Sequence, residues 1–191
     1  MYKEKKVKLI SAMSHAHSSN PFVIGNGKDL PWPPRSIPSD MRRFRQLTKG
    51  GSVIIGRVTW DTITPKYRPF DKDIPVDEAR QTIVVTRNSA FKVDDPRVMV
   101  AHSLEEALRV ATREVIWIGG GSQIYEASYA YVDELHMTLV KGNFEGDVHF
   151  PLYPPDSNRP ICTATIAEGR LDLEDLFETK YVFAKIVDQK T

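Results

Sequence analysis

The sequence has 191 residues, of which 41% are hydrophobic and 27% charged, and a length of this kind allows one compact domain with a sizeable core. The formal net charge of +1 lacks the basic excess of nucleic-acid or membrane-surface proteins, and no segment is long and apolar enough to span a membrane. Cys162 is the only cysteine, which excludes a disulfide within the chain and favours a reducing compartment.

The first third of the chain alternates short apolar segments with loop and helix. Residues 7–13 are mainly apolar and rich in β-forming side chains, which predicts a buried strand. Residues 14–36 are dense in Gly, Pro, Asn and Ser and are expected to form a loop. Pro38 is well placed to begin a helix that reaches about Thr48, because proline is tolerated at the first helical position. Residues 52–56 then form the next buried strand.

The middle of the chain continues this alternation. A helix begins near Arg57 and must stop by Thr64, because Pro65 disfavours helical geometry in the residue before it. Residues 66–80 form a polar, proline-containing insertion with no predicted element. Two β-branched strands and a helix with a capping box of Ser and Glu follow. These elements span residues 81–86, 98–101 and 103–111, with Ser103 and Glu106 as the capping box.

The last part of the chain contains more strands than helices. Residues 115–118 form a strand that leads into three glycines and then a helix beginning at Ser122. Further strands are expected at residues 134–140, 162–166 and 181–187. Alternating strands and helices predict a mostly parallel central sheet with helices on both faces, and the final strands predict an antiparallel C-terminal edge. The fold class is therefore α/β, a single three-layer domain formed by the whole chain.

Two glycine-rich strand-to-helix junctions are candidate phosphate sites, at residues 54–60 (IIGRVTW) and 117–125 (WIGGGSQIY). Glycine allows a sharp turn after a strand, and a helix N-terminus presents unpaired N–H groups that suit a diphosphate. Either glycine could equally do no more than end its strand, and neither junction has the GxGxxG pattern. Arg57 and Arg87 could grip a phosphate, although a surface arginine is usually only solvated.

A glycine-rich segment and an isolated acid are the other candidate features. Residues 24–32 (IGNGKDLPW) are polar at the centre and apolar at both ends, a pattern that suits a mobile lid over a ligand. Asp40 shares a helix face with Met41 and Phe44. Its carboxylate is either a helix-start acid stabilised by the dipole or a buried acid that meets a polar ligand in an apolar pocket. The spacing alone slightly favours the first.

Seven motifs, in order, resemble those of dihydrofolate reductases. They read VIGNGKDLPW, PSDMRRFRQLT, IIGRVTW, TIVVTR, IGGGSQIY, LHMTLV and FEGDVHFP, and they cover nearly the whole chain. The resemblance implies a dihydrofolate reductase-like fold. It also implies the NADPH-dependent reduction of 7,8-dihydrofolate to 5,6,7,8-tetrahydrofolate, with hydride delivered to C6 and a proton to N5.

The resemblance assigns roles on the substrate side. Asp40 matches the acid that hydrogen-bonds the pterin, and Thr138 matches the threonine that supports this carboxylate; with Trp32 they are the candidate catalytic residues. Arg80 is the expected partner of the substrate's glutamate α-carboxylate, with Arg68 as the alternative if the insertion has moved that role. The residues expected to line the pterin and benzoyl pocket are Ile10, Met41, Phe44 and Ile63.

On the NADPH side, the resemblance implies that backbone groups hold the nicotinamide carboxamide and that the glycine junctions hold the phosphates. Ala12 and Ile24 match the carboxamide positions. Members of the family carry a non-proline cis peptide in a glycine pair, which counting back from Tyr125 places at Gly120–Gly121, although three glycines in a row leave the register ambiguous. The expected phosphate-side residues are Gly56, Arg57, Thr59, Thr86, Arg87, Gly120, Gly121, Ser122 and Gln123.

Two other functions stay open. A reductase of a pyrimidine intermediate in riboflavin synthesis has a related fold and glycine-rich junctions, but it gives no reason for LPW followed by an acid on the next helix. A nucleotide-binding module without catalysis would not need Asp40, Trp32 and Thr138. We expect a monomeric, cytoplasmic enzyme that binds neither nucleic acid, membranes nor a metal. Three segments are longer than in compact family members and have no predicted role, near residues 15–22, 33–37 and 65–79.

Overall fold

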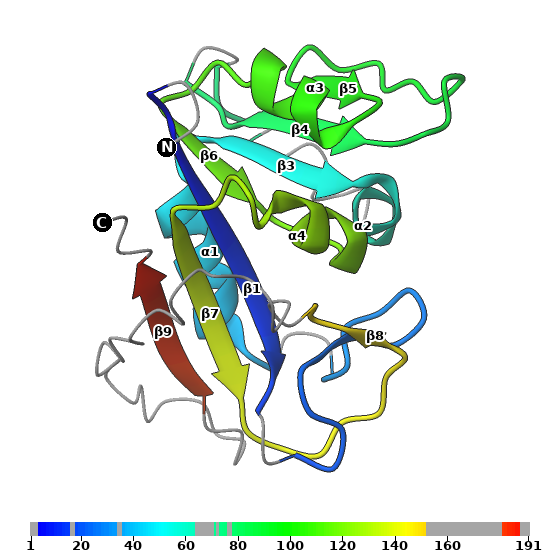
Figure 1. Cartoon of the computed structure of the whole chain (residues 1–191), viewed down its shortest axis with the longest axis vertical. Helices are drawn as coiled ribbons and strands as arrows, with labels where there is room; N and C mark the ends of the chain where they lie inside the picture. Colours follow the sequence, from blue (N-terminus) through cyan, green and yellow to red (C-terminus); the bar gives the residue numbers. More distant parts are fainter. Residues whose placement is uncertain are drawn as a thin grey trace.

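A computed structural model describes residues 4–15, 18–33, 36–63, 71, 73–75 and 78–151, and the backbone of residues 181–187. Within these ranges the main feature is a seven-stranded sheet with the strand order β5-β4-β3-β6-β1-β7-β9 (Figure 1). Its strands are β1 (Lys6–Ser14), β3 (Ser52–Gly56), β4 (Gln81–Val85), β5 (Val98–Ala101), β6 (Val115–Ile118), β7 (Glu134–Val140) and β9 (Tyr181–Val187).

The strands of this sheet run parallel except at one edge. Only β9 is antiparallel to its neighbour, β7. The predicted mostly parallel sheet with an antiparallel C-terminal edge is therefore confirmed, whereas the strand expected at residues 162–166 lies outside the described residues. Strand β6 follows β5 in the chain but lies between β3 and β1. The strand order reverses there, and ligands of open α/β sheets bind beside such a point, at the carboxyl ends of the strands.

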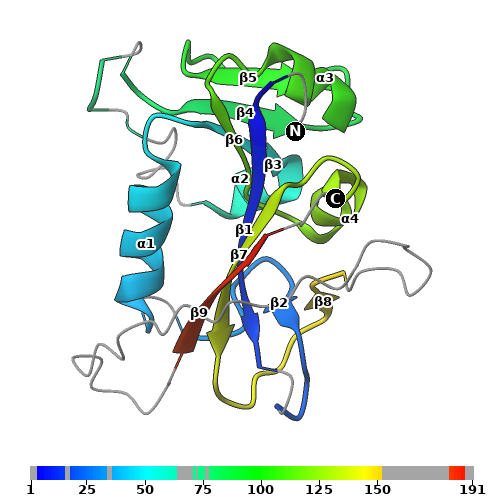
Figure 2. The ribbon, with the colours of Figure 1, turned by 60° about the vertical axis from the view of Figure 1, so that its left-hand side comes forward.

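Helices cover both faces of the sheet. Figure 2 shows α1 (Pro38–Thr48) on one side and α4 (Ser122–Ser128) on the other. Along β3, Ile54 packs in the core under α3 (Leu104–Val110), while Val53 and Ile55 pack with Trp60 of α2 (Arg57–Thr62) in a separate core. Because both faces of β3 are buried, its sequence is a continuous apolar run instead of an alternating one.

The predicted loop over residues 14–36 is partly wrong. It contains a short strand, β2 (Val23–Gly25), which pairs antiparallel with β8 (Val148–His149) in a separate two-stranded sheet. A segment of three residues is too short to show the alternation that predicts a strand. β2 is a strand because it pairs with β8, which is distant in the sequence. A smaller difference is that α2 ends at Thr62, two residues before the predicted limit.

One of the two hydrogen bonds of the predicted capping box at α3 is present, and the other is formed with a different residue. The hydroxyl of Ser103 accepts a hydrogen bond from the Glu106 N–H at 3.0 Å, as expected. The Glu106 carboxylate accepts from the N–H of His102 at 2.7 Å, one residue before the cap.

No helix in the described part of the chain is long and apolar enough to cross a membrane. Across the same residues, no group of three or more His, Cys, Asp or Glu side chains could hold a metal ion.

Candidate active site

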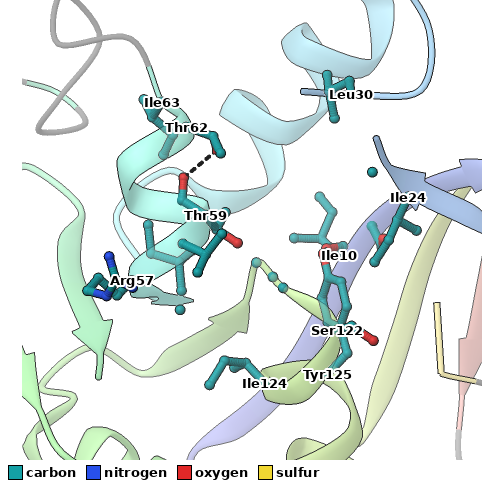
Figure 3. A pocket seen from close by; sticks show the side chains of 18 of the residues that line it. Ile10, Ile24, Leu30, Arg57, Thr59, Thr62, Ile63, Ser122, Ile124 and Tyr125 are labelled. Atoms are coloured by element: carbon teal, nitrogen blue, oxygen red, sulfur yellow. Dashed lines mark hydrogen bonds between the residues drawn. The ribbon is translucent and has the colours of Figure 1, made fainter. Parts of the chain in front are cut away.

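A cleft of about 2650 Å³ opens at the carboxyl ends of the parallel strands, beside the reversal in strand order. Pockets for one small ligand usually measure roughly 300–1,000 Å³, so this cleft has room for two ligands. Among the described residues, every candidate from the sequence lines it except Thr138, which is hydrogen-bonded to Asp40. Figure 3 shows Ile10 and Ile24 on one side of the cleft and Thr59, Thr62 and Ile63 on the other.

Asp40 is held by a strand distant from it in the sequence. Helix α1 begins at Pro38 and places Asp40 in its first turn, and the hydroxyl of fully buried Thr138 on β7 donates to Asp40 Oδ1 at 2.6 Å. Burial raises the pKa of the half-buried Asp40 carboxyl, while the Thr138 hydrogen bond and the charge of Arg43 oppose that rise. Asp40 is therefore a partly desolvated acid at the cleft wall as well as a helix-start acid.

The apolar wall around Asp40 combines buried and exposed side chains. Ile10 is buried and Phe44 half-buried, while Met41 is 45% exposed at the rim. Trp32 is buried and packs edge-to-face against Phe144, with 5.7 Å between the ring centroids. This contact anchors the C-terminal end of the segment expected to act as a lid, residues 24–32.

The same segment is also tied down at its centre by Asp147. The Gly27 N–H donates to Asp147 Oδ1 at 2.8 Å, and the Asp147 N–H donates to the Gly25 carbonyl at 3.1 Å. Backbone hydrogen bonds between Asn26 and Asp29 close a turn between them. Asp147 belongs to the motif FEGDVHFP, and nothing in the sequence indicated a role for it. Its two hydrogen bonds hold the backbone of Gly25 and Gly27 in place.

The two glycine-rich junctions meet in space. The Gly56 N–H donates to the Gly120 carbonyl at 2.7 Å. The peptide bond between Gly120 and Gly121 is cis, at the register that was expected. A Cβ atom built on Gly121 would lie 3.1 Å from Thr59 Oγ1, so the first junction packs closely against the backbone of the second. Together they form one surface, made largely of main-chain atoms.

Two of the three short helices bordering the cleft have N-termini free of acidic side chains. The first turns of α2 and α4 contain no acid, and their N-cap residues, Gly56 and Gly121, make no side-chain capping bond. The first turn of α3, in contrast, carries Glu105 and Glu106. No acidic side chain therefore offsets the positive dipole ends of α2 and α4.

Charged and polar side chains extend this surface. The Arg57 guanidinium lies 2.5 Å from Asp61, and both side chains are 43% exposed. Arg87 is exposed two residues after the end of β4 and lines the cleft. Thr86 is buried, and its hydroxyl accepts a hydrogen bond from the N–H of its near neighbour Asn88 at 3.1 Å.

Arg80 lines the cleft as predicted, but it already has a carboxylate partner. Its Nε donates to Asp71 Oδ2 at 2.6 Å, its Nη2 donates to Asp71 Oδ1, and its Nη1 donates to the Thr48 hydroxyl at 2.9 Å. Burial alone would raise the pKa of Asp71, but the hydrogen bonds from Arg80 and the charges of Arg80 and Lys49 together lower it. Asp71 belongs to the insertion, where nothing in the sequence indicated a role. Arg68 lies outside the described residues.

Tyr125 is a second residue without an expected role. Its buried hydroxyl donates to the Ile10 carbonyl at 2.9 Å, which ties α4 to β1 at the floor of the cleft. Burial raises the pKa of Tyr125 well above its usual value, so the phenol stays protonated and acts as a donor. The motif IGGGSQIY contains this tyrosine, and its fixed distance from the glycines was the available signal.

Both the sequence and the fold of this chain are similar to those of known proteins. Residues 6–169 match the family described as dihydrofolate reductase. The dihydrofolate reductase of Bacillus subtilis (strain 168) is 36% identical over 161 residues, 84% of this chain and 85% of the relative. That of Mycobacterium tuberculosis (strain H37Rv) is 32% identical over 143 residues, 75% and 76% of the two chains. A solved structure of dihydrofolate reductase from Enterococcus faecalis, complexed with NADP(H) and RAB-propyl, has a TM-score of 0.73 and 26% identity, with full coverage of both chains.

Proposed function

Because this chain belongs to the dihydrofolate reductase family, we propose that it catalyses the NADPH-dependent reduction of 7,8-dihydrofolate to 5,6,7,8-tetrahydrofolate. The observation that carries this proposal is one continuous cleft with the Asp40–Thr138 pair in one part and the paired glycine junctions in another. The first suits a pterin, and the second suits a dinucleotide diphosphate.

The residues present fit NADPH, which supplies the hydride when bound. A side chain at Gly121 would press on Thr59, so a bound diphosphate would meet bare backbone at this point. The acid-free ends of α2 and α4, with Arg57 and Arg87, provide the positive field that phosphates need. The backbone of Ala12 and Ile24 lies in the same cleft and is available to the nicotinamide carboxamide.

Asp40 is the acid that orients the substrate. Its carboxylate, held by Thr138, accepts hydrogen bonds from the pterin ring and polarises it toward protonation at N5. Ile10, Phe44 and Ile63 surround the pterin with apolar surface and keep bulk water away. Residues 24–32, shaped by Asp147, cover the reacting atoms, and water admitted past them delivers the proton.

A single assay tests the proposal against both alternatives. Purified protein is mixed with NADPH and either dihydrofolate or the pyrimidine intermediate of riboflavin synthesis, and NADPH oxidation is followed. We expect oxidation with dihydrofolate alone and a large loss of rate in Asp40→Asn. Oxidation only with the pyrimidine would favour the related reductase, and NADPH binding without oxidation would favour a non-catalytic module.

We further propose that residues 1–191 form one domain that acts as a monomer in the cytoplasm. The first and last described strands, β1 and β9, belong to one sheet, which supports a single folding unit. The single cysteine and the net charge of +1 suit a reducing compartment and a small-molecule enzyme that binds no nucleic acid. Light scattering of the purified enzyme would test the oligomeric state.

A further inference from the structure

The ion pair between Arg80 and Asp71 occupies an unusual place in the cleft. Arg80 and Asp71 are both largely buried, with side chains 7% and 14% exposed. The guanidinium lies over the Phe44 ring, 6.0 Å from its centroid, and therefore borders the apolar pocket that would hold the substrate. A buried arginine at this point can bind the carboxylate of a ligand that extends out of the pocket.

The Asp71 carboxylate has the geometry of such a ligand. Its two oxygens accept from Nε and Nη2 of Arg80, which is the paired, parallel arrangement by which arginine binds a carboxylate. A third bond, from the Arg80 backbone N–H to Asp71 Oδ2 at 3.0 Å, fixes it further. The remaining nitrogen, Nη1, donates to buried Thr48. The side of the guanidinium that suits a carboxylate is thus taken by a residue of the chain itself.

We propose that Asp71 is a specificity-determining residue that competes with the carboxylate of a ligand's glutamate tail for Arg80. It thereby lowers the affinity for glutamate-tailed ligands and leaves tail-free ligands unaffected. The inference rests on the proposed function, because it takes the substrate's tail to reach Arg80.

Competition follows from charge and tethering. A tail carboxylate that displaces Asp71 exchanges one carboxylate for another and gains little. If Asp71 stays, two negative charges share one guanidinium and repel each other. Asp71 is attached nine positions before Arg80, and a tethered group acts at an effective concentration on the order of millimolar or higher. It therefore competes well with a tail that must be brought in by the rest of the ligand.

The experiment compares two inhibitors on the full-length enzyme with NADPH bound. Methotrexate carries a glutamate tail, whereas trimethoprim carries no carboxylate. Their dissociation constants are measured by calorimetry for the wild type, for Asp71→Asn and for Asp73→Asn. The last variant is the matched control, because it removes one negative charge from an exposed position of the same segment.

We expect Asp71→Asn to tighten methotrexate by about tenfold, which corresponds to about 1.4 kcal/mol, and to leave trimethoprim within about twofold. Asp73→Asn should leave the ratio of the two constants within about twofold. Weaker methotrexate binding in Asp71→Asn would overturn the proposal, because Asp71 would then be positioning Arg80 for the tail. An equal shift for both inhibitors, no shift, or the same shift in Asp73→Asn would overturn it too.

Two further measurements keep the outcome interpretable. Thermal unfolding reports whether Asp71→Asn folds, and Asp71→Ser, with a smaller neutral side chain, replaces it if it does not; the expected shift is the same. Oxidation of NADPH by the wild type with dihydrofolate is measured separately. Its absence would overturn the proposed function, whereas normal activity with an unchanged inhibitor ratio in the Asp71 variants would overturn only the present inference.

Discussion

Two arginines that line the same cleft carry ion pairs of opposite character. Arg57 pairs with Asp61 one helical turn away, and both side chains are 43% exposed. Arg80 pairs with Asp71 from the insertion, and these side chains are only 7% and 14% exposed. An exposed pair is screened by water and is worth about 1 kcal/mol or less. Arg57 can therefore exchange its partner for a phosphate at little cost, whereas a ligand carboxylate at Arg80 must replace a well-held internal one.

The two parts of the cleft differ in the same way. The proposed cofactor side is built largely from backbone, where Gly56, Gly120 and Gly121 meet, and its charged side chains are exposed. The proposed substrate side depends on single, partly buried side chains, above all Asp40 and Arg80. A single substitution at Asp40 should therefore have a larger effect than any single substitution on the cofactor side.

The largest expected effect is that of Asp40→Asn. Asparagine has nearly the same shape but cannot hold an ionised acid beneath the pterin, so hydride transfer near pH 7 should slow by roughly 10²- to 10⁴-fold. The rate should partly recover as the pH falls, because solvent can then protonate N5, while NADPH binding stays unchanged. Single-turnover measurements from about pH 5 to 9 test this. A near-normal rate at pH 7 would show that Asp40 is only a helix-start acid with no role in the reaction.

The same variant tests why the Asp40 pKa is raised. A carboxyl whose pKa is higher in the folded than in the unfolded chain holds its proton more tightly when folded. Its contribution to stability therefore falls as the pH rises from the unfolded pKa through the folded one, and the ionised form destabilises the fold above that window. Asp40→Asn should accordingly have a Tm at pH 7 equal to or above that of the wild type. A lower Tm would mean that the Thr138 hydrogen bond outweighs burial.

The next effect is expected on the exposed side. We predict that Arg57 and Arg87 both pair with the ribose 2′-phosphate of NADPH, which NADH lacks. Hydrogen bonds to charged groups contribute about 1.5–3 kcal/mol each, so replacing both arginines with alanine should raise the KM for NADPH by at least about a hundredfold. The KM for NADH should change little. Equal effects on the two cofactors would show that the two arginines do not bind the 2′-phosphate.

A smaller effect is expected for Arg80→Ala, because Asp71 already reduces the contribution of Arg80 to the binding of a glutamate tail. Methotrexate binding should weaken by about tenfold and trimethoprim binding by less than about twofold, as measured by titration of each inhibitor. Equal losses for the two inhibitors would indicate that the insertion has moved tail binding to another residue, with Arg68 as the candidate.

The smallest effect should come from Asp61→Asn, the exposed counterpart of Asp71→Asn. Removing the acid beside Arg57 leaves the arginine to the cofactor, but an exposed pair is worth about 0.2–1 kcal/mol. The KM for NADPH should fall by less than about fivefold, with kcat unchanged. A larger decrease than the methotrexate gain in Asp71→Asn would contradict the contrast between the exposed and buried pairs.

Local sequence determined much of the fold. Helix α1 begins at Pro38, as predicted, because proline suits a first helical turn, and it ends at Thr48 as expected. The buried strands β3 and β6 also have the predicted bounds, since short apolar runs rich in β-branched residues, such as SVIIG, favour a strand covered on both faces. The helix and the strands depend on neighbours within a few positions, which a sequence displays directly. The cis peptide at Gly120–Gly121 was expected only from the family resemblance, with its register counted back from Tyr125.

Tertiary structure decided the features that join distant residues. Strand β2 exists because it pairs with β8, more than a hundred residues later, and three residues carry no period that would predict it. The contact between the two glycine junctions depends on β6 returning to lie beside β3. Asp71 meets Arg80 at the end of α1, where Thr48 binds the same guanidinium, and no local pattern predicts this contact. The sequence shows which residue types are present and how far apart they are. The partner of a buried charge depends on how the chain packs. That packing therefore determines whether the charge is available to a ligand.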